Sequence, residues 1–118
     1  MENSNPEVYL RHILDAIHRI EKHIFGVQKV DFFKDDSTAA AAAVRELEII
    51  GEAITQMPEA YRTKHTSVPW REITDMRNRL IHGYFSVDYK IVWKTVTEDL
   101  KPLKQQVEDL LQNLDGTK

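Results

Sequence analysis

The sequence predicts an all-α protein that folds as an antiparallel helix bundle, in a single domain over residues 1–118. Apolar residues recur at spacings of three and four along most of the chain, which is the period of one face of a helix. No segment alternates apolar and polar residues as a half-buried strand does. Because only four glycines and four prolines interrupt the chain, the connections are short, and short connections place successive helices antiparallel.

The first helix is expected over residues 6–25. Asn5 is a favourable N-cap, and Pro6 suits the first helical turn. Gly26 is a favourable residue just beyond the end of a helix. The apolar stripe of this helix comprises Leu10, Ile13, Ile17, Ile20 and Ile24. Residues 27–36 are expected to form a linker to the next helix.

The second helix is expected to run from Ser37, or from an aspartate just before it, to Met57 and to stop at Pro58. Five consecutive alanines, the strongest helix formers, lie in its first half. A glycine inside a helix costs up to about 1 kcal/mol relative to alanine. We therefore expect Gly51, which lies inside this helix, to permit the close approach of a second helix.

Residues 58–69 are expected to be a loop with room for one helical turn. The third helix is expected from about Trp70 to Gly83. Three apolar residues follow one another within it at spacings of three and four, and they define the face that should point inward. They are Ile73, Met76 and Leu80.

The fourth helix is expected to begin after Ser86 or Asp88 and to reach about Leu114. Pro102 lies inside it and removes one backbone hydrogen bond, so we expect a kink near Glu98. The apolar seam of this helix comprises Trp93, Val96, Leu100, Leu103, Val107, Leu110 and Leu114. Such a seam fits an intramolecular core, and it also fits packing against a second subunit.

Composition excludes several functional classes. The chain has no cysteine, so disulfides, thiolate catalysis and thiolate metal sites are ruled out, which suits a reducing cytoplasm. We expect no signal peptide, because the first residues lack a basic start and an apolar stretch. No apolar run approaches the roughly 20 residues that span a bilayer. The net charge of -3 is unusual for a general nucleic-acid binder, so any RNA site must be locally basic.

The end of the third helix carries the side chains of this sequence that are best suited to catalysis. On an ideal helix Asn78 and His82 share a face, and Arg77 lies roughly 140° around from His82. The long Arg77 side chain can still reach over the flank of the helix. Tyr84 can turn back to the same side if the helix loosens at Gly83. The sequence therefore predicts a cluster of guanidinium, amide, imidazole and phenol.

This set of groups suits cleavage of RNA without a metal. Histidine can act as base or acid near neutral pH. Arginine stays charged and binds phosphate oxygens through two parallel donors. One His82 per chain does not provide an acid and a base together, but a symmetric dimer that brings two of them to one cleft would.

The same residues also have an ordinary structural interpretation. A cation in the last turn of a helix, followed by a glycine, is what helix-end electrostatics and capping favour without any function. Asp75 and Arg79 are spaced as an i,i+4 ion pair. From the residues alone, both interpretations stay open.

Several motifs in the chain together resemble a known family. Arg77, four intervening residues, His82 and then Tyr84 resemble the motif of the HEPN superfamily, and Asn78 supplies the polar residue that often follows the arginine. Residues 45–53, which read RELEIIGEA, resemble the second-helix signature of HepT proteins. Further matching positions are Val68-Pro69-Trp70, Val87-Asp88 and Val92-Trp93. The resemblance covers roughly residues 6–115.

The resemblance implies an antiparallel four- to five-helix bundle that forms a homodimer with a shared RNA cleft. It implies a toxin ribonuclease in which Arg77 and His82 are catalytic and Asn78 positions one of them. It also implies a partner antitoxin, an MntA-like minimal nucleotidyltransferase that uses ATP to place AMP on Tyr84. The competing hypothesis is a non-catalytic helical subunit that binds nucleotide or presents Tyr84 to this partner, which the low basic charge slightly favours.

The remaining charged residues have weaker assignments. Arg71 and Arg79 are candidates for extending the RNA-phosphate track, although each is more often plain surface charge. Glu48 and Glu52 are best interpreted as a solvated face or as partners of Arg45. No compact ligand set is expected from His12, His18, His23 and His65. We therefore predict no metal site and no cofactor.

Overall fold

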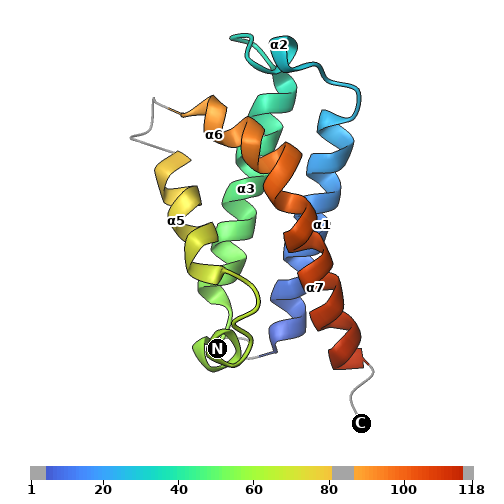
Figure 1. Ribbon diagram of the computed structural model, residues 1–118, viewed down its shortest axis with the longest axis vertical. Coiled ribbons are helices and arrows are strands. Elements are labelled where there is room, and N and C mark those ends of the chain that lie inside the picture. The colour runs from blue at the N-terminus through green and yellow to red at the C-terminus, as the bar shows by residue number, and fades with distance from the viewer. Residues whose placement is uncertain (1–4, 81–86, 116–118) are drawn as a thin grey trace.

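The computed structural model describes residues 5–80 and 87–115, and within these ranges the secondary structure is helical, without a strand. Figure 1 shows α1 and α3 side by side and antiparallel, with α5 on the flank of α3 and α7 descending across α1. This confirms the prediction of an all-α antiparallel bundle. In chain order the elements are α1 (Pro6–Ile24), α2 (Lys29–Phe32), α3 (Thr38–Gln56), α4 (Glu59–Lys64), α5 (Trp70–Leu80), α6 (Tyr89–Lys94), a π-helical turn (Thr95–Asp99) and α7 (Leu100–Asp115).

The two longest helices begin and end where the sequence predicts, to within one residue. The Asn5 side chain accepts a hydrogen bond from the Glu7 N–H at 3.0 Å, which caps α1. Gly26 follows this helix with a positive φ of 76°, a conformation that glycine adopts at no steric cost. The Ser37 hydroxyl caps α3 by accepting from the Ala40 N–H at 3.1 Å. Local capping therefore fixes the ends of both helices.

The segment expected to be a plain linker contains α2, which is the main correction to the predicted architecture. Phe32 in this short helix is fully buried, and its ring centroid lies 4.9 Å from that of Trp93. One helical turn directs this ring inward, and burial of the ring stabilises a turn that has no side-chain cap of its own.

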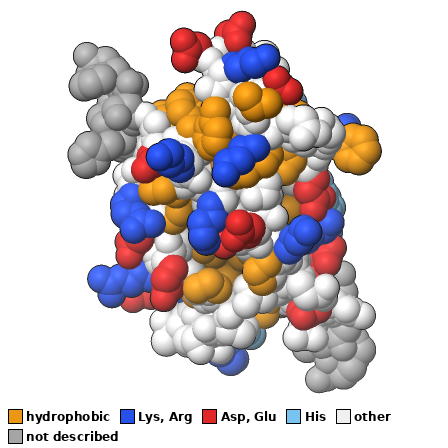
Figure 2. Space-filling model, turned by 45° about the horizontal axis from the view of Figure 1, so that its top comes forward, with side chains coloured by type: hydrophobic (Ala, Val, Ile, Leu, Met, Phe, Trp, Pro, Cys, Tyr) orange, Lys and Arg blue, Asp and Glu red, His pale blue; other side chains and the backbone are white. Residues whose placement is uncertain are grey.

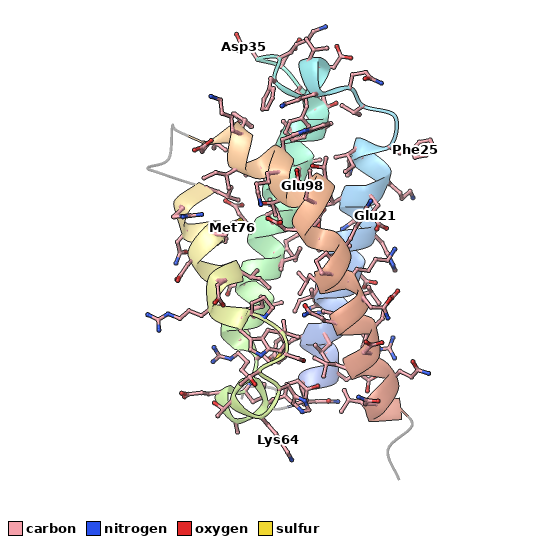
Figure 3. All side chains as sticks on the ribbon, viewed as in Figure 1. Glu21, Phe25, Asp35, Lys64, Met76 and Glu98 are labelled. Atoms are coloured by element: carbon pink, nitrogen blue, oxygen red, sulfur yellow. The ribbon has the colours of Figure 1, made fainter. Side chains whose placement is uncertain are left out.

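The connection between α3 and α5 contains the expected helical turn, α4. The third predicted helix begins at Trp70, as expected, and the described part of it ends at Leu80; its expected end at Gly83 lies outside the described residues. Leu80 is buried, but Ile73 and Met76 are only partly buried. They border an apolar groove of about 290 Å³ between α5 and α7. Figure 3 shows Met76 on the side of α5 that faces the rest of the bundle.

The kink predicted near Glu98 coincides with the π-helical turn Thr95–Asp99. Pro102 has no N–H to donate to the Glu98 carbonyl. In the same region the Leu100 N–H donates to the Thr95 carbonyl, which is the i,i+5 pattern of a π-helix. The proline is thus accommodated by a local change of helical pitch.

The apolar seam of the fourth predicted helix is buried in the core of its own chain. Its buried members are Val96, Leu100, Leu103, Val107 and Leu110, and Leu111 joins them. Because α7 packs against α1, an intramolecular core accounts for this seam. None of the helices in the described part of the chain combines the length and the apolar character that a bilayer crossing requires.

Candidate functional site

The side chain of Arg77 lies across α3 at the position of Gly51. A β-carbon placed on Gly51 would stand 2.9 Å from the Arg77 Cγ, 3.1 Å from its Cδ and 3.3 Å from its Cβ. The aliphatic part of the arginine therefore occupies the space that any other residue at position 51 would fill. The close approach expected at Gly51 is confirmed, but it is made by an arginine side chain and not by the backbone of a second helix.

Only part of the Arg77 guanidinium forms hydrogen bonds with the protein. Its Nη1 donates to the Asn78 Oδ1 at 3.1 Å, while its Nε is buried and has no hydrogen-bond partner among the described residues. Among the described residues, no carboxylate lies within ion-pair distance of this guanidinium. A buried donor on a charged group that finds no acceptor costs free energy, so the protein keeps this arginine in place at some cost in stability.

Arg77 borders a shallow pocket of about 200 Å³ on the surface of α3 and α5. Its lining residues are Arg45, Glu48, Ile49, Glu52 and Arg77. Glu52 accepts a hydrogen bond from the Gln56 side chain at 2.9 Å, so its carboxylate contacts the next turn of α3. Of the two interpretations of Glu48 and Glu52, an ion pair with Arg45 does not form within the described ranges, and the solvated face remains. The pocket thus brings together two arginines, two carboxylates and one apolar side chain.

The other candidate residues of α5 are exposed. Asn78 is exposed and contacts Arg77 directly. Arg71 is exposed and lies 3.9 Å from Asp75, measured between Nε and Oδ2. The predicted pairing of Asp75 with Arg79 is therefore wrong, because the aspartate turns one helical turn back instead of forward. Arg79 is exposed on the same helix.

His82 and Tyr84 lie outside the described residues, so their place beside Arg77 stays a prediction. The structure does fix both ends of the connection that carries them. The Asp88 N–H donates to the Leu80 carbonyl at 3.1 Å, and the Asp88 side chain caps α6 by accepting from the N–H groups of Lys90 and Ile91. Leu80 and Asp88, which lie on either side of the segment that carries them, are therefore in direct contact.

Two buried polar features were not foreseen. Glu46 is only 8% exposed and forms an ion pair with Arg19 across the interface of α1 and α3, at 3.0 Å between Oε1 and Nε. This contact lacks good hydrogen-bond geometry, since the same oxygen has no hydrogen-bond partner. Arg62 of α4 also buries its Nε without a partner. Nothing in the spacing of these residues distinguishes them from surface charges.

Burial raises the pKa of Tyr61, whose ring lies 4.2 Å from that of His65, but both residues belong to α4 and its end and not to the pocket of Arg77. Within the described ranges, no three histidine, aspartate or glutamate side chains come close enough together to hold a metal ion.

The fold and the site are those of a small all-α protein with an arginine on the flank of its helix bundle, which is hydrogen-bonded to an amide and forms no ion pair within the described residues. The chain belongs to the HepT-like ribonuclease family, because the family model described as "Ribonuclease HepT-like" matches residues 13–110. This confirms the resemblance inferred from the motifs.

Curated relatives agree with the family assignment. The chain is 44% identical over 107 residues to a protein of Caldanaerobacter subterraneus provisionally named RNase TTE0752, covering 91% of this chain and 95% of that protein. It is also 44% identical over 102 residues to the probable ribonuclease HepT of Thermococcus cleftensis, covering 86% of this chain and 92% of that protein. No solved structure gives a significant match.

Proposed function

We propose that this protein is a ribonuclease that cleaves RNA without a metal ion, with Arg77 and His82 as its catalytic residues. The observation that carries the proposal is Arg77, whose aliphatic stem lies against α3 and whose guanidinium is bound by Asn78 and pairs with no carboxylate in the described part of the chain. The names given to the relatives, and the family to which the chain belongs, support RNA as the substrate.

The proposed chemistry is an internal transesterification. A base accepts the proton of the 2′-hydroxyl, whose oxygen attacks the adjacent phosphorus. The bond from phosphorus to the 5′-oxygen then breaks, and an acid gives that oxygen a proton. Negative charge gathers on the non-bridging oxygens, where the forked donors of Arg77 would stabilise it. His82 is the residue suited to both proton transfers.

One His82 per chain explains why we propose a homodimer. A symmetric pair of chains would bring two imidazoles and two guanidinium groups to one cleft, so that one histidine serves as base and the other as acid. Asn78 then has a positioning role, because its Oδ1 holds the Nη1 of Arg77, and the Nη2 donors would remain for phosphate.

Because charges of both signs are mixed on the surface, recognition of RNA would depend on the local site. Figure 2 shows lysine and arginine side chains interspersed with aspartate and glutamate over the face in view. With a net charge of -3, long-range attraction of RNA to the whole molecule is weak. The proposed substrate recognition therefore rests on the few arginines near Arg77, with Arg71 and Arg79 as further candidates for phosphate contacts.

RNA cleavage in the presence of EDTA tests the proposal. The wild-type protein should cleave single-stranded RNA with the chelator present, and His82→Ala should abolish cleavage while the circular dichroism spectrum keeps its helical form. Cleavage by both proteins to the same extent would identify a contaminating nuclease. A folded wild-type protein that binds RNA but never cuts it would support the alternative, a non-catalytic subunit, which the acidic charge balance favours.

We further propose that the protein acts in the cytoplasm as a toxin and is silenced by transfer of AMP from ATP to Tyr84 by a partner nucleotidyltransferase. The attached phosphate would compete with RNA phosphate for Arg77. Co-expression with such an enzyme should relieve growth inhibition and add the mass of AMP to the intact protein. Tyr84→Phe should remain toxic and unmodified; an unchanged adduct on this variant would contradict the assignment.

A further inference from the structure

We propose that Gly51 is a positioning residue for Arg77: the absence of a side chain at position 51 sets where the guanidinium lies. The inference deepens the proposed function and, for its effect on RNA, rests on it. Gly51 itself touches no substrate in this proposal. It acts only through the arginine that lies over it.

The conformation of Gly51 gives no reason for a glycine. It lies inside α3 and is buried, and the positive φ that demands a glycine in this chain belongs to Gly26 among the described residues. Glycine is also a poor helix former, and alanine would normally favour a helix at such a position. A glycine here therefore needs an explanation from its surroundings.

The surroundings supply that explanation through one residue. Apart from its chain neighbours and the backbone of its own helix, the three heavy atoms nearest to a β-carbon on Gly51 all belong to the Arg77 side chain, at 2.9, 3.1 and 3.3 Å. Real β-carbons essentially never approach another atom within 3.0 Å, so a methyl group and the present path of the arginine exclude each other. Arginine stems commonly lie along an apolar surface in this way while the charged end reaches outward.

The clash cannot be relieved without moving the guanidinium. The atoms concerned are Cβ, Cγ and Cδ, at the near end of the side chain, and Cβ is fixed to the backbone of α5. Relief requires either a rotation about the first side-chain torsions, which carries the guanidinium away from Asn78 and from its pocket, or a displacement of α5 from α3. Both would misplace the group that we assign to the phosphate.

A double-mutant cycle in thermal stability tests the coupling without reference to RNA. Gly51→Ala alone should lower the melting temperature or leave it unchanged. In the Arg77→Ala background, where Cγ and Cδ are gone, the same change should raise it by several degrees, because the helix gains alanine without the main clash. Thr55→Ala is the matched control, since it places alanine one turn further along α3 at an exposed position, and its effect should be the same in both backgrounds. Equal effects of Gly51→Ala in both backgrounds would overturn the proposal.

RNA measurements distinguish positioning from a general loss of packing. Gly51→Ala should lower kcat for RNA cleavage about tenfold or more at temperatures where the variant is fully folded, and it should weaken binding of 2′-O-methyl RNA, which cannot be cut. In the Arg77→Ala background it should weaken this binding no further. Wild-type affinity and kcat in Gly51→Ala would overturn the positioning role. If the wild-type protein cuts no RNA, the proposed function fails, while the thermal cycle still decides whether Gly51 and Arg77 are coupled.

Discussion

Replacing Arg77 by alanine is expected to lower the rate of RNA cleavage by about 100-fold to 1,000-fold, because preorganised charge stabilisation of a transition state is worth this much in comparable sites. The loss should appear in kcat, since the guanidinium meets the largest charge only as the phosphorane forms. The fold should persist, because the arginine contributes packing at the surface of α3 and forms no ion pair within the described ranges. Single-turnover cleavage assays, together with circular dichroism, measure both effects.

Conservative and neighbouring variants make this prediction specific. Arg77→Lys keeps the charge but loses the forked donors and the hydrogen bond to Asn78, so an intermediate loss is expected. Arg79→Ala and Arg71→Ala, at exposed positions on the same helix, should change mainly KM and by about tenfold or less. Arg11→Ala on α1, where Arg11 pairs with Glu7 at 2.9 Å, serves as a control and should leave cleavage unchanged. Equal losses in Arg79→Ala and Arg77→Ala would refute the special role of Arg77.

The features that the sequence predicted well depend on short-range physics. The ends of α1 and α3 follow from Asn5, Gly26 and Ser37, whose hydrogen bonds and backbone angle act within three residues of each helix end. The kink predicted near Glu98 follows from Pro102, whose missing donor affects only the preceding turn, and a π-helical turn lies at this place. Such effects can be predicted because the neighbours concerned are fixed by chain connectivity.

The features that escaped prediction depend on contacts between distant parts of the chain. Two adjacent phenylalanines occur near the predicted linker, and nothing in their spacing indicates that Phe32 is buried while Phe33 is partly exposed. The ion pair of Arg19 with Glu46 likewise joins two helices whose facing surfaces the pattern does not specify. Gly51 was recognised as unusual, but its partner Arg77 follows only from how α5 lies on α3.

In the candidate site too, short-range features could be predicted and contacts between distant parts of the chain could not. The motif identified Arg77 and Asn78, and the structure joins them by a hydrogen bond. The motif could not show that the arginine stem lies on α3, where its Nε is buried and has no hydrogen-bond partner among the described residues. An arginine held in this way loses little conformational entropy when it binds phosphate, so the same contact that stabilises the bundle would also prepare the site. The roles of His82 and Tyr84 stay predictions from the motif.

Phe32→Ala is expected to cause the largest loss of stability among the changes considered, about 3–5 kcal/mol, because it removes a fully buried ring and leaves a cavity beside Trp93. For a domain of this size the melting temperature should fall by about 10 °C or more. Phe33→Ala is the matched control. This neighbouring residue is 37% exposed, and its ring centroid lies 6.4 Å from that of Trp93. Its removal should therefore lower the free energy of unfolding by less than half as much. Urea denaturation followed by circular dichroism measures both. Similar losses in the two variants would mean that α2 does not direct Phe32 selectively into the core.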